Sequence, residues 1–332
     1  MPQADFLLGT SMEKIFVARA IFPDVLERLT QYFEVEANQE DRIYAETELM
    51  EKLRGKVAVL TTASETMSAA VIKANLQLKA ICNMAVGYNN IDLNAATAAG
   101  IMVTNTPDVL NETTADFGWA LLMSTARRVT ESEHWLRAGE WQKWRYDSFL
   151  GADVHGATLG IIGMGRIGQA IARRSIGFNM RVVYHNRSRL APDLEREANN
   201  AVYASKEELL AVADHIVLAL PYSAASHHTI AAADLAQMKR SATLVNVARG
   251  GIVDDAALIE ALADGRIAAA GLDVFENEPH IDPRFLMLKN VVLTPHIASA
   301  SKATRHAMAE CAVANMVVAL SKQRPPNLVN SV

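Results

Sequence analysis

A glycine-rich turn lies between a strand-like run and a helical pattern near the middle of the chain. Residues 160–168 read Gly-Ile-Ile-Gly-Met-Gly-Arg-Ile-Gly. In such a turn Gly163 allows a tight bend, Gly165 lets the backbone approach a pyrophosphate, and Gly168 lets helix and strand pack closely. The N-terminus of the following helix offers N–H groups to the phosphate charge. The segment therefore predicts a dinucleotide-binding site in an α/β sheet.

The residues after the next strand-like run indicate which dinucleotide binds. Enzymes that use NAD usually place an acid there to hold the ribose, whereas the 2′-phosphate of NADP needs cations. Asn186 stands where the acid would be, and it is followed by Arg187, Ser188 and Arg189. Guanidinium groups suit a phosphate by charge and by geometry. We therefore predict NADP as the cofactor, with NAD as a weaker alternative; the other interpretation of these arginines is a solvated loop.

Length and composition are typical of a two-domain globular enzyme. The chain has 332 residues, of which 50% are hydrophobic and 21% charged. A net charge of −5 favours neither nucleic acid nor an anionic membrane as a partner. The two cysteines, Cys82 and Cys311, cannot form a disulfide framework or a structural zinc site, and no cluster has metal-ligand spacing. Without an export signal or a transmembrane run, we expect a cytoplasmic protein. Met1–Ser11 is expected to be a loose extension, with Met12 as an alternative start.

Two series of alternating strands and helices organise the chain. The first series has strand-like runs at Ile15–Ala18, Val57–Leu60, Lys79–Cys82 and Ile101–Thr104. The second series has them at Thr158–Ile162, Arg181–Tyr184, His215–Leu220, Thr243–Val247, Ala268–Leu272 and Val291–Thr294. A long helical stretch from about Thr113 to Gly139 joins the two series, and a final helix, Lys302–Leu320, has no strand after it.

These patterns predict an α/β protein of two domains. A doubly wound Rossmann-type cofactor domain, residues 107–299, is inserted into a smaller flavodoxin-like parallel α/β substrate domain, residues 1–106 and 300–332. We expect the two connections between them to act as a hinge.

Three polar residues follow predicted strands of the second series, where ligands bind in doubly wound sheets. They are Arg249, Glu278 and His296. Reduction of a carbonyl by hydride needs a proton donor, a group that keeps the donor charged, and a cation that holds the substrate. Histidine, a carboxylate and arginine meet these needs. Taken singly, each has an ordinary interpretation as a turn histidine, a surface acid or a capping arginine.

Several further motifs occur in the same order as in a known family. They are Val86–Asp92, Asn105–Pro107, Gly160–Gly168, Val245–Gly250, Gly271–Phe275 and Thr294–Ile297. On these motifs the chain resembles the D-isomer-specific 2-hydroxyacid dehydrogenases over nearly its whole length. Within that family it is most similar to the glyoxylate/hydroxypyruvate reductases, including bacterial 2-ketogluconate reductases, which tend to prefer NADPH.

The resemblance implies a role for each matching residue. His296 would be the general acid in reduction and the base in oxidation, with Glu278 as its partner, and Arg249 would bind the substrate carboxylate and carbonyl. The backbone N–H groups around Val86 and Gly87 would hold the carboxylate from the first domain. The resemblance also implies further cofactor contacts. Thr114 would lie near the nicotinamide, Asp273 at its amide, and Leu220 and Pro221 at the adenosine. The remaining implied cofactor-binding residues are Arg166, Ile167, Val247 and Ala248.

The implied activity is NADPH-dependent reduction of small 2-keto acids, such as glyoxylate, hydroxypyruvate or 2-ketogluconate, to D-2-hydroxy acids. Formate oxidation moves no hydroxyl proton and is excluded by a carboxylate at Glu278. A D-3-phosphoglycerate-type dehydrogenase is an alternative, although the chain has no C-terminal regulatory domain. A cofactor-sensing binding protein, like the transcriptional corepressors of this fold, is another; the absence of a basic face weighs against it.

Other polar and aromatic residues are assigned from local sequence alone. The remaining histidines, among them His227 and His228, have no partners nearby in sequence and are expected to be solvated. We expect Ala63–Glu65 and Met84 to line the substrate pocket. The segment Gly139–Tyr146 is aromatic and basic. It packs against its own cofactor domain, or it forms a two-fold contact in a homodimer and lends Trp144 to the neighbouring active site.

Overall fold

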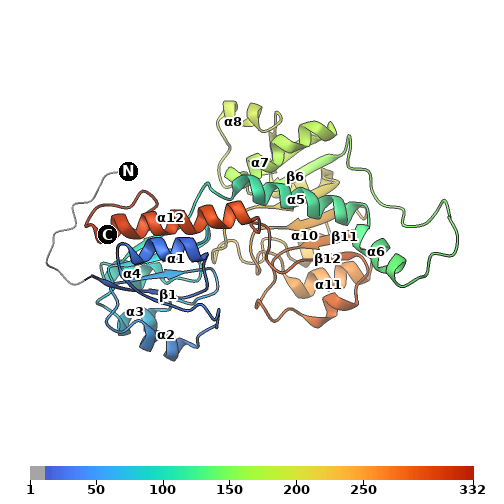
Figure 1. Ribbon diagram of the computed structural model, residues 1–332. Coiled ribbons are helices and arrows are strands. Elements are labelled where there is room, and N and C mark those ends of the chain that lie inside the picture. Colours follow the sequence, from blue (N-terminus) through green and yellow to red (C-terminus); the bar gives the residue numbers. More distant parts are fainter. Residues whose placement is uncertain (1–11) are drawn as a thin grey trace. The chain divides into compact units, whose positions relative to one another are not determined.

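The computed structural model describes residues 12–332, so the expectation for Met1–Ser11 lies outside the described residues. The chain divides into two compact units. Unit 1 holds the chain up to Val109 together with Ser301–Val332, and unit 2 is Leu110–Ala300. Unit 2 is therefore an insertion in unit 1, and Figure 1 shows it in the colours from green to orange. None of the helices between residues 12 and 332 is long and apolar enough to span a membrane.

Unit 1 is built on a parallel sheet. Its strands, in the part of the chain that the structure describes, are β1 (Lys14–Val17), β2 (Glu34–Ala37), β3 (Ala58–Thr61), β4 (Ala80–Asn83) and β5 (Met102–Thr104). Their order is β2-β1-β3-β4-β5, which is the flavodoxin-like order. Strand β2 was not predicted, because its sequence Glu-Val-Glu-Ala is half charged and lacks a hydrophobic run. It is an edge strand, where glutamates reach solvent.

Helices cover both faces of this sheet. Helices α1 (Pro23–Thr30) and α12 (Lys302–Leu320) pack on one face, and α2 (Glu46–Lys52), α3 (Ala69–Ala74) and α4 (Leu93–Ala98) pack on the other. Successive residues of β1 lie on opposite faces of the sheet. Ile15 and Val17 belong to the core with α1 and α12, whereas Phe16 belongs to the core with α2, α3 and α4. Because both faces are buried, the central strands are continuously apolar, which is why the sequence predicted them.

Unit 2 is built on a longer parallel sheet. Its described strands are β6 (Thr158–Ile162), β7 (Arg181–His185), β8 (Val202–Tyr203), β9 (His215–Leu218), β10 (Thr243–Asn246), β11 (Ala269–Leu272) and β12 (Val291–Leu293). Their order, β12-β11-β10-β9-β6-β7-β8, reverses direction between β6 and β9, as in a Rossmann-type sheet. The predicted doubly wound fold is confirmed. The two-residue edge strand β8 was not predicted, and β9 ends two residues before the predicted end.

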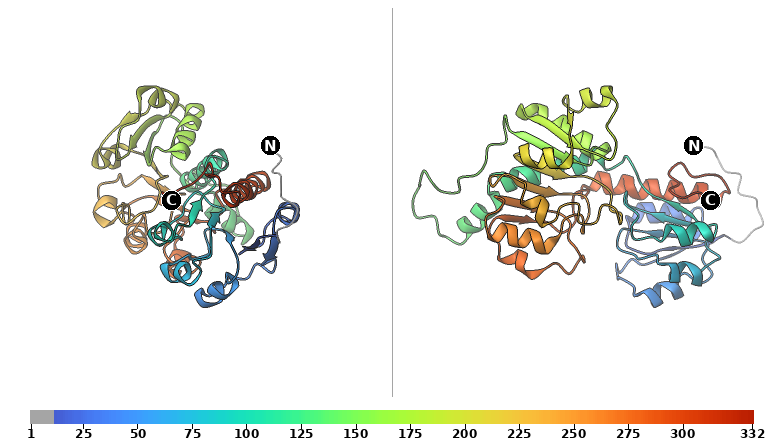
Figure 2. Two further views of the ribbon diagram at one scale, coloured as in Figure 1. Left: turned by 90° about the vertical axis from the view of Figure 1, so that its left-hand side faces the viewer. Right: turned by 180° about the vertical axis from the view of Figure 1, so that it is seen from behind.

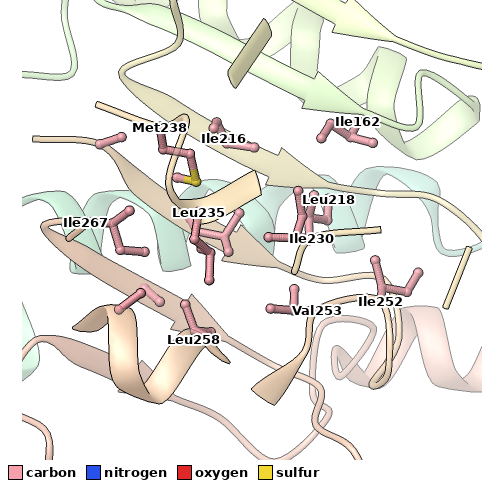
Figure 3. Close-up of a cluster of buried hydrophobic side chains, with 14 of the residues drawn as sticks. Ile162, Ile216, Leu218, Ile230, Leu235, Met238, Ile252, Val253, Leu258 and Ile267 are labelled. Carbon is pink, nitrogen blue, oxygen red and sulfur yellow. The ribbon is translucent and has the colours of Figure 1, made fainter. Parts of the chain in front are cut away.

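The helices of unit 2 also form two layers. Helices α5 (Asn111–Ala126) and α7 (Arg166–Arg174) cover one face, and η1 (Ser175–Phe178) follows α7. On the other face lie α9 (Lys206–Val212), α10 (Ala232–Leu235), α11 (Asp255–Ala263) and η2 (Pro283–Met287). Figure 3 shows the core on this face, where Ile216 and Leu218 of β9 meet Leu235 of α10 and Ile230 of the preceding turn. Helix α8 (Pro192–Glu197) follows β7.

The prediction of one helical stretch over Thr113–Gly139 is wrong. The stretch consists of α5 and α6 (Val129–Arg137), separated by Arg128 in the left-handed conformation with φ 55°. Its guanidinium is held by both carboxylate oxygens of Glu131, at 2.8 and 2.9 Å. The helical pattern of the sequence is not interrupted at this point, so the break was not visible from composition. The chain after α6 extends away from the rest of unit 2 (Figures 1 and 2).

Candidate functional site

The glycine turn between β6 and α7 leaves open space at one position only. Gly163 has φ 99°, and a Cβ there would lie 2.6 Å from the backbone carbon of Ala219. A Cβ on Gly168 would lie 2.2 Å from the carbonyl oxygen of Gly163. Around Gly165, in contrast, no atom lies within 4 Å of a built Cβ. The first and third glycines are therefore required by the fold itself, whereas the second keeps a space clear at the start of α7.

This open space has the features that a pyrophosphate requires. The N–H of Gln169 donates to the carbonyl of Gly165 at 2.9 Å, so the amides of Ile167 and Gly168 precede the first turn of intrahelical bonds in α7. Amides at a helix N-terminus and the positive end of its dipole stabilise an anion. A side chain at Gly165 would occupy the same space. The residues present at this turn therefore fit a dinucleotide cofactor.

Asn186 ties the end of β7 to the glycine turn. Its side-chain oxygen accepts a hydrogen bond from the N–H of Met164 at 2.8 Å, and its carbonyl accepts one from the hydroxyl of Tyr203 at 3.1 Å. The sequence placed Asn186 at the ribose-binding position. The structure adds that Asn186 also fixes the glycine turn.

The two arginines after β7 differ in their surroundings. Arg189 forms a bidentate ion pair with Glu195, with Nε–Oε1 and Nη2–Oε2 distances of 2.8 and 2.9 Å, and Tyr184 donates its hydroxyl to Oε1 at 2.7 Å. The bonds from Arg189 and Tyr184 hold the pKa of Glu195 at about 2. Arg187 and Ser188 are exposed, and no ion pair among residues 12–332 involves Arg187. Arg187 is therefore open to solvent, while Arg189 anchors the loop through Glu195.

The other predicted cofactor residues lie at the carboxyl ends of the strands of unit 2 or beside them. Val247 and Ala248 directly follow β10, Leu220 and Pro221 follow β9, Asp273 directly follows β11, and Thr114 is buried in the first turns of α5. The built Cβ of Gly163 would approach the N of Leu220 to 2.6 Å, so the turn after β9 borders the glycine turn.

His296 and Glu278 form a direct pair. The imidazole Nδ1 of His296 lies 2.8 Å from Oε2 of Glu278, and the other carboxylate oxygen accepts a hydrogen bond from the N–H of Phe275 at 2.8 Å. Burial raises the pKa of Glu278, but the hydrogen bond and charge of His296, together with Phe275 and Arg249, outweigh it and leave the pKa lowered. The carboxylate is therefore ionised at neutral pH and accepts a hydrogen bond from the imidazole.

Arg249 lies in the tight turn after β10. Asn246 fixes this turn, because its side chain donates to the carbonyl of Arg249 and accepts from the N–H of Ala248, both at 3.0 Å. The guanidinium Nη1 donates to the carbonyl of Ala248 at 2.7 Å. Burial lowers the pKa of Arg249, and the charge of Glu278 opposes this effect. Arg249 and His296 therefore each lie within electrostatic range of Glu278.

Asp273 holds the turn that carries His296. Its Oδ1 accepts bonds from the hydroxyl of Thr294 and the N–H of Ile297, and its Oδ2 accepts one from the N–H of Ala298, each at 2.8 Å. The N–H of His296 donates to the carbonyl of Asp273 at 2.8 Å. The side chain is completely buried, which raises its pKa despite these bonds. This structural role could not be predicted from the sequence, because the groups that Asp273 binds lie more than 20 residues away.

In unit 1, two asparagines fix the segment that contains Val86 and Gly87. Asn105 donates to the carbonyl of Val86 at 2.8 Å, and Asn83 donates to the carbonyl of Gly87 at 3.0 Å. Thr61 donates to Asn83 at 3.1 Å. Both carbonyl oxygens are thus engaged, and no hydrogen bond between residues 12 and 332 uses the N–H of Val86 or of Gly87. Two adjacent N–H groups with their carbonyls fixed in this way suit a carboxylate.

Comparison with known proteins identifies the family. Residues 119–298 match the family described as "D-isomer specific 2-hydroxyacid dehydrogenase, NAD binding domain". The chain belongs to the D-isomer specific 2-hydroxyacid dehydrogenases. It is 47% identical over 321 residues to a glyoxylate reductase of Thermococcus kodakarensis, a match that covers 96% of each chain. The resemblance stated from the motifs is therefore confirmed.

Solved structures of this family superpose closely on the chain. A glyoxylate reductase from Paecilomyes thermophila gives a TM-score of 0.87 at 33% identity, covering 96% of this chain and 99% of that one. An NADPH-dependent glyoxylate/hydroxypyruvate reductase from Sinorhizobium meliloti, in complex with NADP and malonate, gives 0.85 at 36% identity, covering 96% and 97%.

Several histidines that were expected to be solvated have defined partners in this dehydrogenase, and His228 and His215 are two of them. His228 Nε2 lies 2.6 Å from Oε1 of Glu276, and His215 is fully buried, bonded to Thr243 at 2.8 Å. The expectation is wrong for both, because a histidine's local sequence does not show partners on other strands.

Glu65, expected to line the substrate pocket, is buried, and its Oε2 accepts bonds from the N–H and hydroxyl of Thr62.

The aromatic segment after α6 is exposed. Of its side chains, Trp144 is 78% and Tyr146 81% exposed, and Trp141 is also exposed. The alternative that these rings pack against their own unit is therefore wrong. Arg145 pairs with Asp147, the residue directly after the segment, at 2.9 Å. A group of exposed aromatic rings of this size is typical of a contact surface.

Proposed function

We propose that the chain is an NADP-dependent reductase of small 2-keto acids, with glyoxylate and hydroxypyruvate as substrates and D-2-hydroxy acids as products. The observation that carries this proposal is the 2.8 Å pair of His296 and Glu278, with Arg249 within electrostatic range of the same carboxylate. The relatives named above, which reduce glyoxylate or hydroxypyruvate according to their names, support this substrate class. Bound NADPH supplies the hydride to the keto carbon.

In reduction, His296 donates a proton to the keto oxygen as the carbon accepts the hydride. Glu278, bonded to Nδ1, keeps the imidazole charged and fixes the tautomer, so that Nε2 carries the proton to be donated. Arg249 binds the substrate carboxylate and polarises the carbonyl, because a guanidinium can donate to both at once. In oxidation the neutral imidazole of His296 accepts the proton. We assign the N–H groups of Val86 and Gly87 to the carboxylate as well.

For the cofactor we propose a preference for NADP over NAD. Arg187 and Ser188 would bind the 2′-phosphate, because both are exposed and the guanidinium of Arg187 has no ion pair within the described chain. Arg189 would contribute less directly, since Glu195 already holds two of its nitrogens. The structure of the relative from Sinorhizobium meliloti with NADP supports this choice.

The test is a panel of 2-keto acids of increasing length, including glyoxylate, hydroxypyruvate, phosphohydroxypyruvate and 2-ketogluconate, assayed with NADPH and with NADH. Oxidation of NADPH on glyoxylate or hydroxypyruvate supports the proposal. Turnover only with phosphohydroxypyruvate would point instead to a phosphoglycerate-type dehydrogenase. Tight cofactor binding with no turnover on any 2-keto acid would identify a cofactor sensor.

We propose further that the chain forms a homodimer through the exposed aromatic segment, to which Trp144 and Tyr146 contribute. Exposure of their apolar surface to water is unfavourable, and a two-fold contact would bury this surface on both subunits. Analytical ultracentrifugation of the wild type and of a Trp144→Ser, Tyr146→Ser variant tests this. A monomeric wild-type protein with full activity would rule the dimer out.

A further inference from the structure

The turn that carries Arg249 and the turn that carries Glu278 touch through their backbones. A Cβ on Gly250 would lie 1.7 Å from the carbonyl oxygen of Phe275, so no other residue fits at position 250 without moving one of the turns. The two turns follow the neighbouring strands β10 and β11. The position of Glu278 relative to Arg249 therefore depends on whatever holds these two turns together.

His228, in the turn after β9, links both of these turns. Its N–H donates to the carbonyl of Gly251 at 2.8 Å, and its Nε2 lies 2.6 Å from Oε1 of Glu276. A second backbone bond joins the same two segments, because the N–H of Ile230 donates to the carbonyl of Ile252 at 3.1 Å. Three consecutive strands of the sheet, β9, β10 and β11, thus have their turns connected around His228.

Asp255, the first residue of α11, holds the same turn from the other side. Its Oδ2 accepts the N–H of Glu276 at 3.0 Å, while the preceding amide, of Phe275, donates to the carboxylate of Glu278. Burial, together with the charges of Glu276, Asp254 and Asp282, raises the pKa of Asp255 to about 6, although the hydrogen bond from the N–H of Glu276 lowers it. A buried carboxylate close to other acids destabilises the folded protein, so Asp255 is not explained by a contribution to stability.

We propose that His228, Glu276 and Asp255 are positioning residues for the reaction at His296. They fix the turn of residues 275–278 so that the Glu278 carboxylate stays bonded to the imidazole of His296. Adjacent amides of this turn bond to Asp255 and to Glu278, so a rotation that breaks one bond displaces the other. This inference rests on the proposed function, since it assigns His296 and Glu278 the roles given above.

The test compares His228→Gln, Glu276→Gln and Asp255→Asn with the wild type. Each substitution replaces a titratable group of the cluster by an amide with little change in side-chain size. His306→Gln is the matched control, because His306 forms an equally short pair with Asp24, at 2.7 Å, in unit 1. Two quantities are measured: kcat and KM with NADPH and glyoxylate across pH, and the NMR signal of the His296 imidazole in protein with isotope-labelled histidine. The NMR signal of the Glu278→Gln variant serves as the reference for an unpaired imidazole.

We expect the three cluster variants to lose about 10- to 100-fold in kcat, as displaced catalytic groups do, with an unchanged KM for NADPH. Their His296 signal moves toward that of Glu278→Gln, whereas His306→Gln matches the wild type in both measurements. Wild-type kcat and a wild-type His296 signal in all three folded variants would overturn the inference. If the wild type reduces no 2-keto acid, the proposed function fails, and the NMR comparison still decides whether the cluster positions Glu278.

Discussion

The imidazole Nδ1 of His296 lies 2.8 Å from Oε2 of Glu278, although the two residues come from turns after different strands of the sheet. Each member is held by the backbone of its neighbourhood, Glu278 by the N–H of Phe275 and His296 by the carbonyl of Asp273. Backbone groups of both turns therefore hold the pair in place.

Replacement of Glu278 by Gln should lower kcat while leaving the fold intact. An amide cannot stabilise the imidazolium by charge, and proton transfer by a positioned group is worth about 10²- to 10⁴-fold, so we expect a loss of about 10- to 100-fold. The steady-state rate with NADPH and glyoxylate measures it. The exposed Glu260 on α11 provides the control, since Glu260→Gln should keep the wild-type rate. Equal rates for the two variants would remove Glu278 from the mechanism.

Gly165 and Gly168, in the turn after β6, should respond differently to replacement by alanine. At Gly165 the φ is an ordinary −76° and a Cβ meets no protein atom, so the Gly165→Ala variant should fold normally. The added methyl group would occupy the space left for the cofactor, so we expect NADPH binding to weaken at least about 10-fold, which corresponds to about 1.4 kcal/mol. Gly168→Ala clashes with backbone and should destabilise the fold by about 1–3 kcal/mol. Fluorescence titration and thermal unfolding measure the two effects.

Gly177→Ala is the matched control for these glycine variants, because its Cβ also meets open space outside the glycine turn. It should change neither cofactor affinity nor melting temperature. Undiminished NADPH binding by Gly165→Ala would show that the cofactor does not use this turn.

Arg187→Ala should raise the KM for NADPH and leave the KM for NADH unchanged. A hydrogen bond to a charged group contributes about 1.5–3 kcal/mol, which corresponds to about 10- to 150-fold in affinity. Arg181→Ala, an exposed arginine at the start of β7, is the control and should alter neither value. Arg189→Ala should instead lower the melting temperature, because it leaves Glu195 without its bidentate partner. An unchanged ratio of NADPH to NADH efficiency in Arg187→Ala would contradict the cofactor proposal.

Asp255→Asn should stabilise the protein at neutral pH. The pKa of Asp255 is about 6 in the folded protein against an ordinary value of 3.8, so the folded state binds the proton more tightly. Its contribution to stability is fully present below pH 3.8 and is lost as the pH rises through 6. Two pKa units correspond to about 3 kcal/mol, so above pH 6 we expect the variant to be more stable by about 1–3 kcal/mol.

Urea unfolding at a series of pH values measures this difference, and Asp153→Asn, an exposed aspartate, should show no comparable gain. A stability gain for Asp255→Asn that does not shrink as the pH falls below 6 would contradict the assignment. Together with the expected loss of activity in this variant, the gain would show that the buried acid is kept for function rather than for folding.

Local motifs made most of the candidate site predictable. The glycine turn is contiguous, and Arg249, Glu278 and His296 each follow an apolar strand, so their place at one edge of the sheet could be inferred from the strand order. The fold class followed from the alternation of buried strands and helices.

Contacts between turns were not predictable in the same way. His228 and Glu276 are 48 residues apart in sequence, and neither stands in a distinctive local pattern. Arg189 has Glu195 six residues away, but only the structure shows that this pair occupies its guanidinium. A break in a helix, such as the one at Arg128, depends on a single backbone angle that the apolar pattern does not record.

The most direct test of the account is turnover of glyoxylate with NADPH by the wild type and by His296→Ala. We predict that the wild-type protein oxidises NADPH and that the variant binds NADPH equally well but turns over at least about 10²-fold more slowly, as expected for loss of a general acid. Equal turnover by the two proteins would contradict the central claim that His296 supplies the proton.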